Sequence, residues 1–190
     1  MNTTLARSNL CLNRYCRFMA LLTTLVIITM LIGAFAPLLF YFFNIENIGL
    51  GSAGYSFFIS NSVDVDPTEL DFWQALLAVI IDTAKILILV YAFYQLKLLF
   101  VKYSQSDFFS ERSTNHCYIF GKMLVTWSIF NILSEPLLTL ILSFKQTERY
   151  FSFSLSSGDI MVLFPAISIM LIGQILKKAC QLAEENRQFV

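Results

Sequence analysis

The stretch AVIIDTAKILIL, residues 78–89, decides the fold class because it is apolar apart from Asp82, Thr83 and Lys85. It lies inside a longer apolar segment that covers residues 72–96. About 20 residues of helix cross the hydrocarbon core of a bilayer, so this segment is long enough to span a membrane. The stretch therefore predicts a transmembrane helix that carries an acid and a base near its middle.

The composition of the whole chain agrees with this prediction. Of its 190 residues, 57% are hydrophobic and 14% are charged. Soluble domains have roughly 45–50% apolar and about 25% charged residues. The formal net charge is zero, so the chain lacks the basic surplus that is typical of direct nucleic-acid binding. These values indicate an integral membrane protein.

Four apolar segments are long enough to cross a bilayer: residues 18–43, 72–96, 118–144 and 160–176. A membrane β-barrel would instead need many short strands of alternating polarity, so only helices fit this pattern. The sequence therefore predicts an all-α membrane protein, a four-transmembrane-helix bundle that forms a single domain over residues 1–190.

The first segment has an alternative interpretation as a signal peptide. It follows three arginines, and Ala34-Phe35-Ala36 imitates a cleavage site. The apolar run is nevertheless longer than the roughly 7–15 residues of a signal-peptide core, and it continues beyond residue 36. We therefore expect it to be a retained membrane span.

The distribution of basic residues predicts the orientation of the spans, because cytoplasmic loops carry an excess of Lys and Arg. The predicted outer loop 44–71 contains neither, and the second outer loop, 145–159, contains only two. The N-terminal tail, the loop 97–117 and a C-terminal helix over 177–190 are basic. We therefore expect both termini to be cytoplasmic. The basic residues on that side are Arg7, Arg14, Arg17, Lys97, Lys102, Arg112, Lys122, Lys177, Lys178 and Arg187.

The cysteines support the same orientation. All four lie on the predicted cytoplasmic side, where the environment is reducing and disulfides are rare. Their spacing matches no zinc-binding pattern, so we expect neither a metal nor another cofactor. They are Cys11, Cys16, Cys117 and Cys180.

The charges of the second span are costly in a membrane. Asp82 and Lys85 each cost about 2.5–3.5 kcal/mol near the centre of a membrane helix. The Leu, Ile and Val residues of this span return roughly 0.3–0.6 kcal/mol each, which nearly cancels that cost. We therefore expect the helix to need polar neighbours. The spacing of three residues places the two charges on one helix face.

A polar face on the third span is the predicted partner. Ser128, Asn131 and Glu135 recur at helical spacing there, and Gln74 extends the face of the second span. Asp82 and Glu135 lie at similar predicted depths, so we expect Lys85 to reach Asp82, Glu135 or both.

This intramembrane cluster has two interpretations. It is either a structural lock between two spans or a site for a proton, an ion or a ligand. Pro37, Pro136 and Pro165 all fall in the outer halves of their spans, and kinks there would open a cup towards the cluster. Prolines are also simply common in membrane helices.

The outer loops predict a small β-cap. YFSFSLS, residues 150–156, alternates apolar and polar side chains, and YSFFIS, residues 55–60, is a second candidate strand. Next to the second span, Asp66 and Pro67 resemble a helix cap and a first helical position. We expect the acidic run there to start the helix rather than to bind calcium.

A cytoplasmic partner surface is the last structural prediction. Phe108 and Phe109 are apolar residues on the predicted cytoplasmic side of the membrane. They either pack against the cytoplasmic ends of the helices or face a partner. Ser110 is placed to cap the next helix. The charged residues that would share this surface are Glu111, Arg112, Glu184 and Glu185.

Two segments carry a family resemblance. SDFFSERSTNHCYIFGKML, residues 106–124, and QLAEENRQFV, residues 181–190, resemble a bacterial membrane family catalogued as domain of unknown function 2975. Ala179 stands near a position where that family often has glycine. The resemblance implies four spans and no known catalytic residues. It also implies a cytoplasmic partner, a helix-turn-helix regulator held at the membrane.

Three functions remain open from the sequence. The first is a non-enzymatic regulatory or sensory membrane protein with a cytoplasmic partner. The second is a small transporter or channel subunit, which would form a homo-oligomer and use the Asp/Lys/Glu cluster. The third is a structural accessory subunit. We find no hydrolase, metalloprotease or nucleotide-binding motif, so we expect no enzyme.

Overall fold

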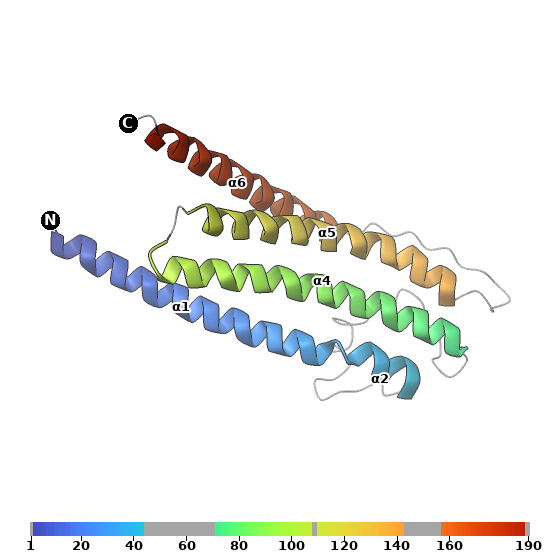
Figure 1. Ribbon diagram of the computed structural model, residues 1–190. Coiled ribbons are helices and arrows are strands. Elements are labelled where there is room, and N and C mark those ends of the chain that lie inside the picture. The colour runs from blue at the N-terminus through green and yellow to red at the C-terminus, as the bar shows by residue number, and fades with distance from the viewer. Residues whose placement is uncertain (1, 44–70, 108–109, 143–156, 189–190) are drawn as a thin grey trace.

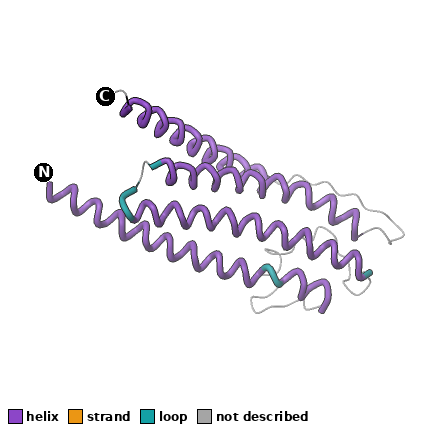
Figure 2. Tube along the Cα trace, viewed as in Figure 1, coloured by secondary structure: helices purple, strands orange, loops and turns teal. Residues whose placement is uncertain are grey.

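The computed structural model describes residues 2–43, 71–107, 110–142 and 157–188. Every regular element within these ranges is a helix (Figures 1 and 2). The helices are α1 (Asn2–Gly33), α2 (Ala36–Phe43), α4 (Phe72–Ser104), α5 (Glu111–Leu142) and α6 (Ser157–Gln188). The predicted cap strands 55–60 and 150–156 and the predicted helix start at Asp66 lie outside the described residues.

Four segments of this structure are long and apolar enough to cross a membrane, as the sequence predicts. They are Leu12–Leu39, Phe72–Ser104, Glu111–Ile141 and Gly158–Asn186. The helices are longer than the predicted spans, because hydropathy marks the part in lipid and not the helix ends. The 33 residues of α4, for example, extend about 50 Å, whereas a hydrocarbon core is about 30 Å thick.

The helices continue beyond two of the predicted spans. Within the predicted loop 97–117, residues 97–104 belong to α4 and residues 111–117 belong to α5. The N-terminal tail is also helical, since α1 begins at Asn2 and not at residue 18. Polar side chains at these positions continue each helix beyond its apolar section.

The first span is interrupted, although the sequence predicts one segment over residues 18–43. Helix α1 ends at Gly33, and α2 begins at Ala36. Pro37 has no backbone N–H to donate to the carbonyl four residues earlier, at Gly33. A tighter bond from the Phe35 backbone N–H to the Ile32 carbonyl, 3.1 Å long, closes the turn. Prolines 136 and 165, in contrast, lie inside continuous helices.

The helices form an antiparallel row (Figure 1). In the part of the chain that the structure describes, broad contacts join α1 to α4, α4 to α5, and α5 to α6. The short helix α2 also packs on α4. Both chain ends lie beside the α4–α5 connection, and we call this the termini end. The opposite end, where α2 and α5 finish and α4 begins, is the far end.

Small residues bring neighbouring helices close together. A Cβ atom at Gly121 of α5 would lie 2.5 Å from the Cα of Met170 of α6. A Cβ at Gly173 would lie 2.6 Å from the backbone nitrogen of Tyr118. These two helices therefore touch through their backbones, which is typical of membrane helix pairs. Between α4 and α5, the buried alanines 75 and 78 pack against Leu138.

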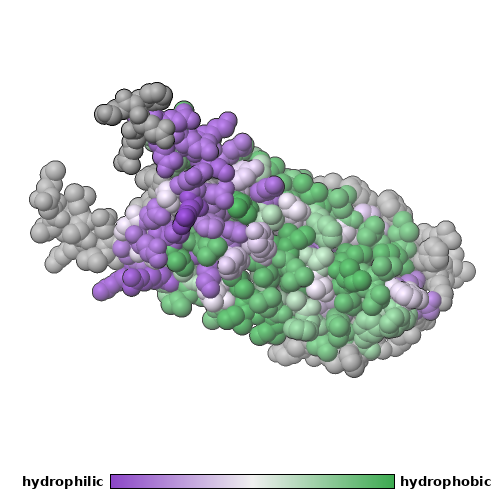
Figure 3. Space-filling view, in the orientation of Figure 1, coloured by the Kyte–Doolittle hydropathy of each residue, from purple (hydrophilic) through white to green (hydrophobic). Residues whose placement is uncertain are grey.

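The surface has the polarity of a membrane protein. Apolar residues cover most of the face that Figure 3 shows, and hydrophilic residues gather at the termini end. Many large apolar side chains are exposed, including Leu21, Phe72 and Phe164. Lipid would cover such side chains in a bilayer, and this placement supports integration into a membrane.

Candidate functional site

The candidate site is a buried polar line along α4, where this helix faces α5. Asp82 is 0% exposed and Lys85 is 6% exposed. Lys85 Nζ lies 2.7 Å from Asp82 Oδ1, so the ion pair that their spacing predicts is present. Gln74 and Gln95, nearer the two ends of the helix, are also buried. A buried ion pair is costly unless its partners are close and well oriented, and a distance of 2.7 Å meets the first condition.

Two hydrogen bonds fix the register between α4 and α5. Near the far end, Gln74 Nε2 donates to the backbone carbonyl of Ile141 at 3.0 Å. Near the termini end, Gln95 Oε1 and His116 Nδ1 are 2.8 Å apart. The helices are antiparallel and rise equally per residue. Each step up the sequence of α4 between these two pairs therefore corresponds to one step down the sequence of α5. Asp82 is therefore level with residue 131, and Lys85 is level with residue 128.

Glu135 lies nearer the far end than the ion pair does. The same register places it level with Ala78, about 6 Å beyond Asp82 along the helix axis. Its side chain is partly buried, and its own backbone carbonyl accepts a hydrogen bond from the Thr139 hydroxyl. The two carboxylates are thus staggered by about one turn. A contact of Lys85 with Glu135, in addition to its contact with Asp82, stays a prediction.

The polar face predicted on the third span is turned partly to α6. Asn131 donates to Asp159 Oδ1 of α6, at 3.4 Å. Ser128 is buried at the level of Lys85, and it lies seven residues after Gly121, on the face of α5 that touches α6.

The polar line is interrupted between Lys85 and Gln95. These residues are ten positions apart, or about 15 Å along the helix. The side chains of α4 that are buried between them are apolar, Ile86 and Ala92. On α5, Ser128 is the buried polar side chain closest to this section. The arrangement can hold a charge in place, and it offers few groups that could relay one onwards.

The termini end contains the residues of the predicted partner surface. Phe108 and Phe109 lie outside the described residues. Glu111 and Arg112 are exposed in the first turn of α5. Ser110 caps that helix as predicted, because its Oγ accepts a hydrogen bond of 3.2 Å from the Ser113 backbone N–H.

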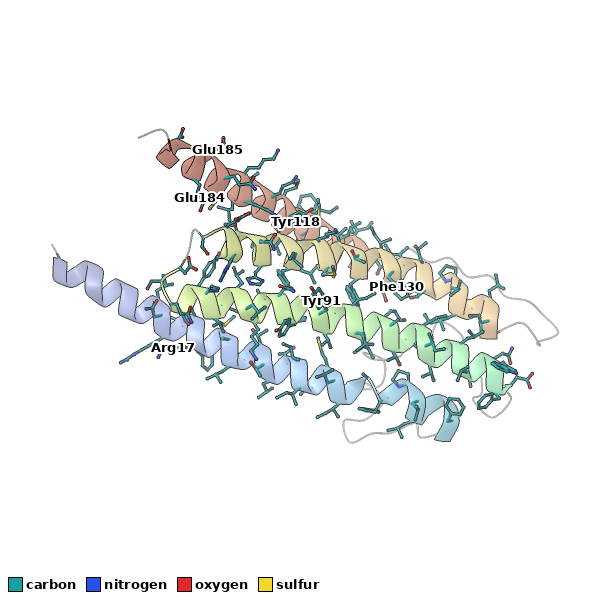
Figure 4. All side chains as sticks on the ribbon, in the orientation of Figure 1. Arg17, Tyr91, Tyr118, Phe130, Glu184 and Glu185 are labelled. Carbon is teal, nitrogen blue, oxygen red and sulfur yellow. The ribbon has the colours of Figure 1, made fainter. Side chains whose placement is uncertain are left out.

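The final turns of α6 complete this surface. Glu184 and Glu185 are exposed, and they lie towards the same end of the molecule as Arg17 of α1 (Figure 4). Lys177 donates to Asn115 Oδ1 at 3.0 Å, which fixes α6 against the start of α5. Beyond Lys177, the helix runs past the first residue of α5.

Sequence reasoning missed several of these polar contacts. Gln95 lies about three turns beyond Lys85 on the same buried side of α4, a spacing that could have revealed it. The partner of His116 on another helix could not be identified from one sequence. Ser134 and Thr139, both buried on α5, follow the helical spacing of the predicted polar face.

A metal centre has no basis in the described part of the chain. No group of three or more His, Cys, Asp or Glu side chains lies close enough there to hold an ion. The chemistry that the arrangement offers is therefore electrostatic: one buried ion pair, a nearby carboxylate and neutral hydrogen-bonding groups.

Comparisons with known proteins add one match. Residues 64–189 match the model of a family described as "Protein of unknown function (DUF2975)". This range holds α4, α5, α6 and the whole candidate site. No curated protein and no solved structure matches the chain.

Proposed function

This chain belongs to the DUF2975 family, whose description gives no activity, and we propose from its geometry that it is a non-enzymatic regulatory membrane protein. In this proposal the α4–α5 polar line is the sensing element, and the last turns of α6 bind a soluble cytoplasmic partner. The family resemblance suggests a helix-turn-helix regulator as that partner.

The observation that carries the proposal is the exposed arm of α6, residues 178–188. Leu182 in this arm is 61% exposed, and Glu184 and Glu185 are exposed as well. An isolated helix shorter than about 12–15 residues is marginal in water. Here the membrane span supplies the turns that nucleate the arm. The result is a preformed helix with one large apolar side chain and two carboxylates available to another protein.

The proposed orientation rests on charge. All Lys and Arg residues in the described ranges, apart from Lys85, lie towards the termini end. Cytoplasmic segments carry such an excess in bacterial membrane proteins. We therefore place both termini in the cytoplasm and the far end outside the inner membrane.

The experiment is affinity purification from native membranes, with mass spectrometry of the proteins that co-elute. The test variant is Leu182→Ser with Glu184→Lys and Glu185→Lys, and the matched control is Gln105→Lys, which adds a positive charge at an exposed position outside the predicted partner surface. We expect a stoichiometric soluble protein that the test variant loses and the control keeps. The transcripts that respond to deletion of that protein should also respond to the test variant.

A different result would contradict the proposal. If the wild type yields only copies of itself, or if the test variant keeps the same partner, the arm is not a docking element. A homo-oligomer without partner would favour the second candidate function.

That second candidate is transport of a proton or an ion. A transport function is favoured by the polar groups that are buried at both ends of α4 and in its middle. The apolar section between Lys85 and Gln95 disfavours it, because about 15 Å of helix carries no buried polar side chain on α4. Proteoliposomes with Glu135→Gln test this alternative, which predicts a flux that depends on Glu135.

A further inference from the structure

The termini end carries a belt of basic side chains that comes from all four long helices. Five of its members are exposed and three are partly buried. None of them forms an ion pair within the part of the chain that the structure describes. We call this set the basic belt: Arg14, Arg17, Lys97, Lys102, Arg112, Lys122, Lys177 and Lys178.

The depth of the belt follows from contacts between helices. Asn13 of α1 hydrogen-bonds Ser106, which follows α4, so Arg17 lies about level with Lys102. On the other side, the contact between Lys177 and Asn115 fixes the level of α6 against α5. Seven of the eight basic residues then fall within about 12 Å along the helix axes. This thickness is comparable to a headgroup layer with the long side chains that reach into it.

Carboxylates at this end lie mainly at its outer edge. Asp107 is in the α4–α5 connection, and Glu111 is in the first turn of α5. Glu184 and Glu185 lie about two turns beyond Lys177. The belt is thus largely on the membrane side of an acidic fringe. A soluble acidic protein would meet the fringe first, whereas lipid headgroups would meet the belt.

Exposed apolar side chains adjoin the belt on its membrane side. Ile175, 66% exposed, is one turn from Lys178. Ile129, also exposed, shares the face of α5 that carries Lys122 and is two turns away. A ligand with an anionic head and apolar chains matches this arrangement. Lys and Arg side chains near a membrane boundary extend their charge to the headgroups while their stems cover apolar surface.

We propose that the basic belt binds anionic phospholipid headgroups, and that Arg112, Lys177 and Lys178 on α5 and α6 form its closest-set group. Arg112 is one turn from Asn115 along α5, and Lys177 is held beside Asn115 by its hydrogen bond. Lys178 follows Lys177 in the chain, so three positive charges from two helices lie within about 5 Å along the helix axes. This binding does not require a soluble partner, so it stands or falls separately from the proposed function.

The test uses the purified full chain in nanodiscs that contain phosphatidylcholine with or without phosphatidylglycerol. Retained lipid is measured by extraction and mass spectrometry after transfer to mild detergent. The test variant is Arg112→Gln, Lys177→Gln and Lys178→Gln, and the matched control is Glu184→Gln with Glu185→Gln. Each basic residue near an anionic surface contributes about fivefold to binding, so the triple change should weaken phosphatidylglycerol binding on the order of a hundredfold.

We expect the wild type and the control to retain phosphatidylglycerol selectively and the triple variant to lose that selectivity. Equal retention of both lipids by the wild type would overturn the proposal. So would a triple variant that retains phosphatidylglycerol as the wild type does. If soluble polyglutamate instead displaces phosphatidylglycerol completely from the wild type, the belt is a site for an acidic protein. Replacing Lys177 and Lys178 with Arg should preserve binding, which separates loss of charge from loss of folding.

Discussion

Removal of Lys85 should destabilise this protein more than removal of both charges of the buried ion pair. The variant Lys85→Met leaves Asp82, which is 0% exposed, without the ammonium group now 2.7 Å away. Breaking a buried ion pair by removing one partner typically costs about 3–5 kcal/mol. Replacing both members with apolar residues of similar volume is often neutral or stabilising. We therefore expect Asp82→Leu with Lys85→Met to be close to the wild type.

The assay is unfolding in mixed micelles, followed by the near-ultraviolet circular dichroism of the native fold. The single variants Lys85→Met and Asp82→Leu and the double variant complete a thermodynamic cycle. If the buried pair is structural, the single changes should each lose several kcal/mol and the double change should recover most of it. A Lys85→Met protein as stable as the wild type would refute the reasoning, because it would show that the pair contributes no coupling.

The cycle also separates the two interpretations of the cluster. A purely structural lock predicts that the stable double variant keeps its partner and its regulatory effect. A sensing site predicts a stable double variant that keeps the partner but no longer responds. Stability and response are measured on the same proteins, so a folding defect cannot be mistaken for a loss of sensing.

Three further predictions concern packing, hydrogen bonding and orientation. Gly121→Ala and Gly173→Ala should each lower the free energy of unfolding by about 1–3 kcal/mol, because the added Cβ meets the backbone of the facing helix. The control Ala179→Leu, on the exposed side of α6, should have little effect. Equal melting temperatures for all three variants would contradict the backbone contact. Gln74→Leu should lose about 1–2 kcal/mol in the same unfolding assay, because the Ile141 carbonyl loses its side-chain donor and the Asp71 backbone N–H loses its acceptor; no loss would mean that neither bond contributes. Fluorescent-protein and alkaline-phosphatase fusions at each terminus should give fluorescence without phosphatase activity, and phosphatase activity at either end would contradict the proposed orientation.

Much of the fold could be predicted because lipid imposes a simple rule on the sequence. Runs such as residues 78–89 have to be helical in a bilayer, where every backbone polar group needs an internal partner. The cap at Ser110 also followed from local chemistry. The helix ends within 97–117 did not, because polar residues continue a helix as readily as they end it. The break at Gly33 lies one turn before Pro37, which has no backbone N–H to donate to the Gly33 carbonyl.

The candidate site could be predicted only where its members lie on one helix. Asp82 and Lys85 are three residues apart, so their pairing is a matter of local geometry. Contacts between helices depend on register, which one sequence does not specify. For this reason the bonds from Gln74 to Ile141 and between Gln95 and His116 were not foreseen. The row arrangement was missed for the same reason, since four apolar spans fit a row or a closed bundle equally well.

The measurement that tests the central proposal most directly is site-specific photo-crosslinking in living cells. A photoreactive amino acid replaces Leu182 in the exposed arm of α6, and the matched control carries it at Ile160, an exposed position near the other end of the same helix. The account predicts one soluble cytoplasmic protein crosslinked at position 182 and only lipid or membrane proteins at position 160. No soluble adduct at position 182, or the same adducts at both positions, would contradict it.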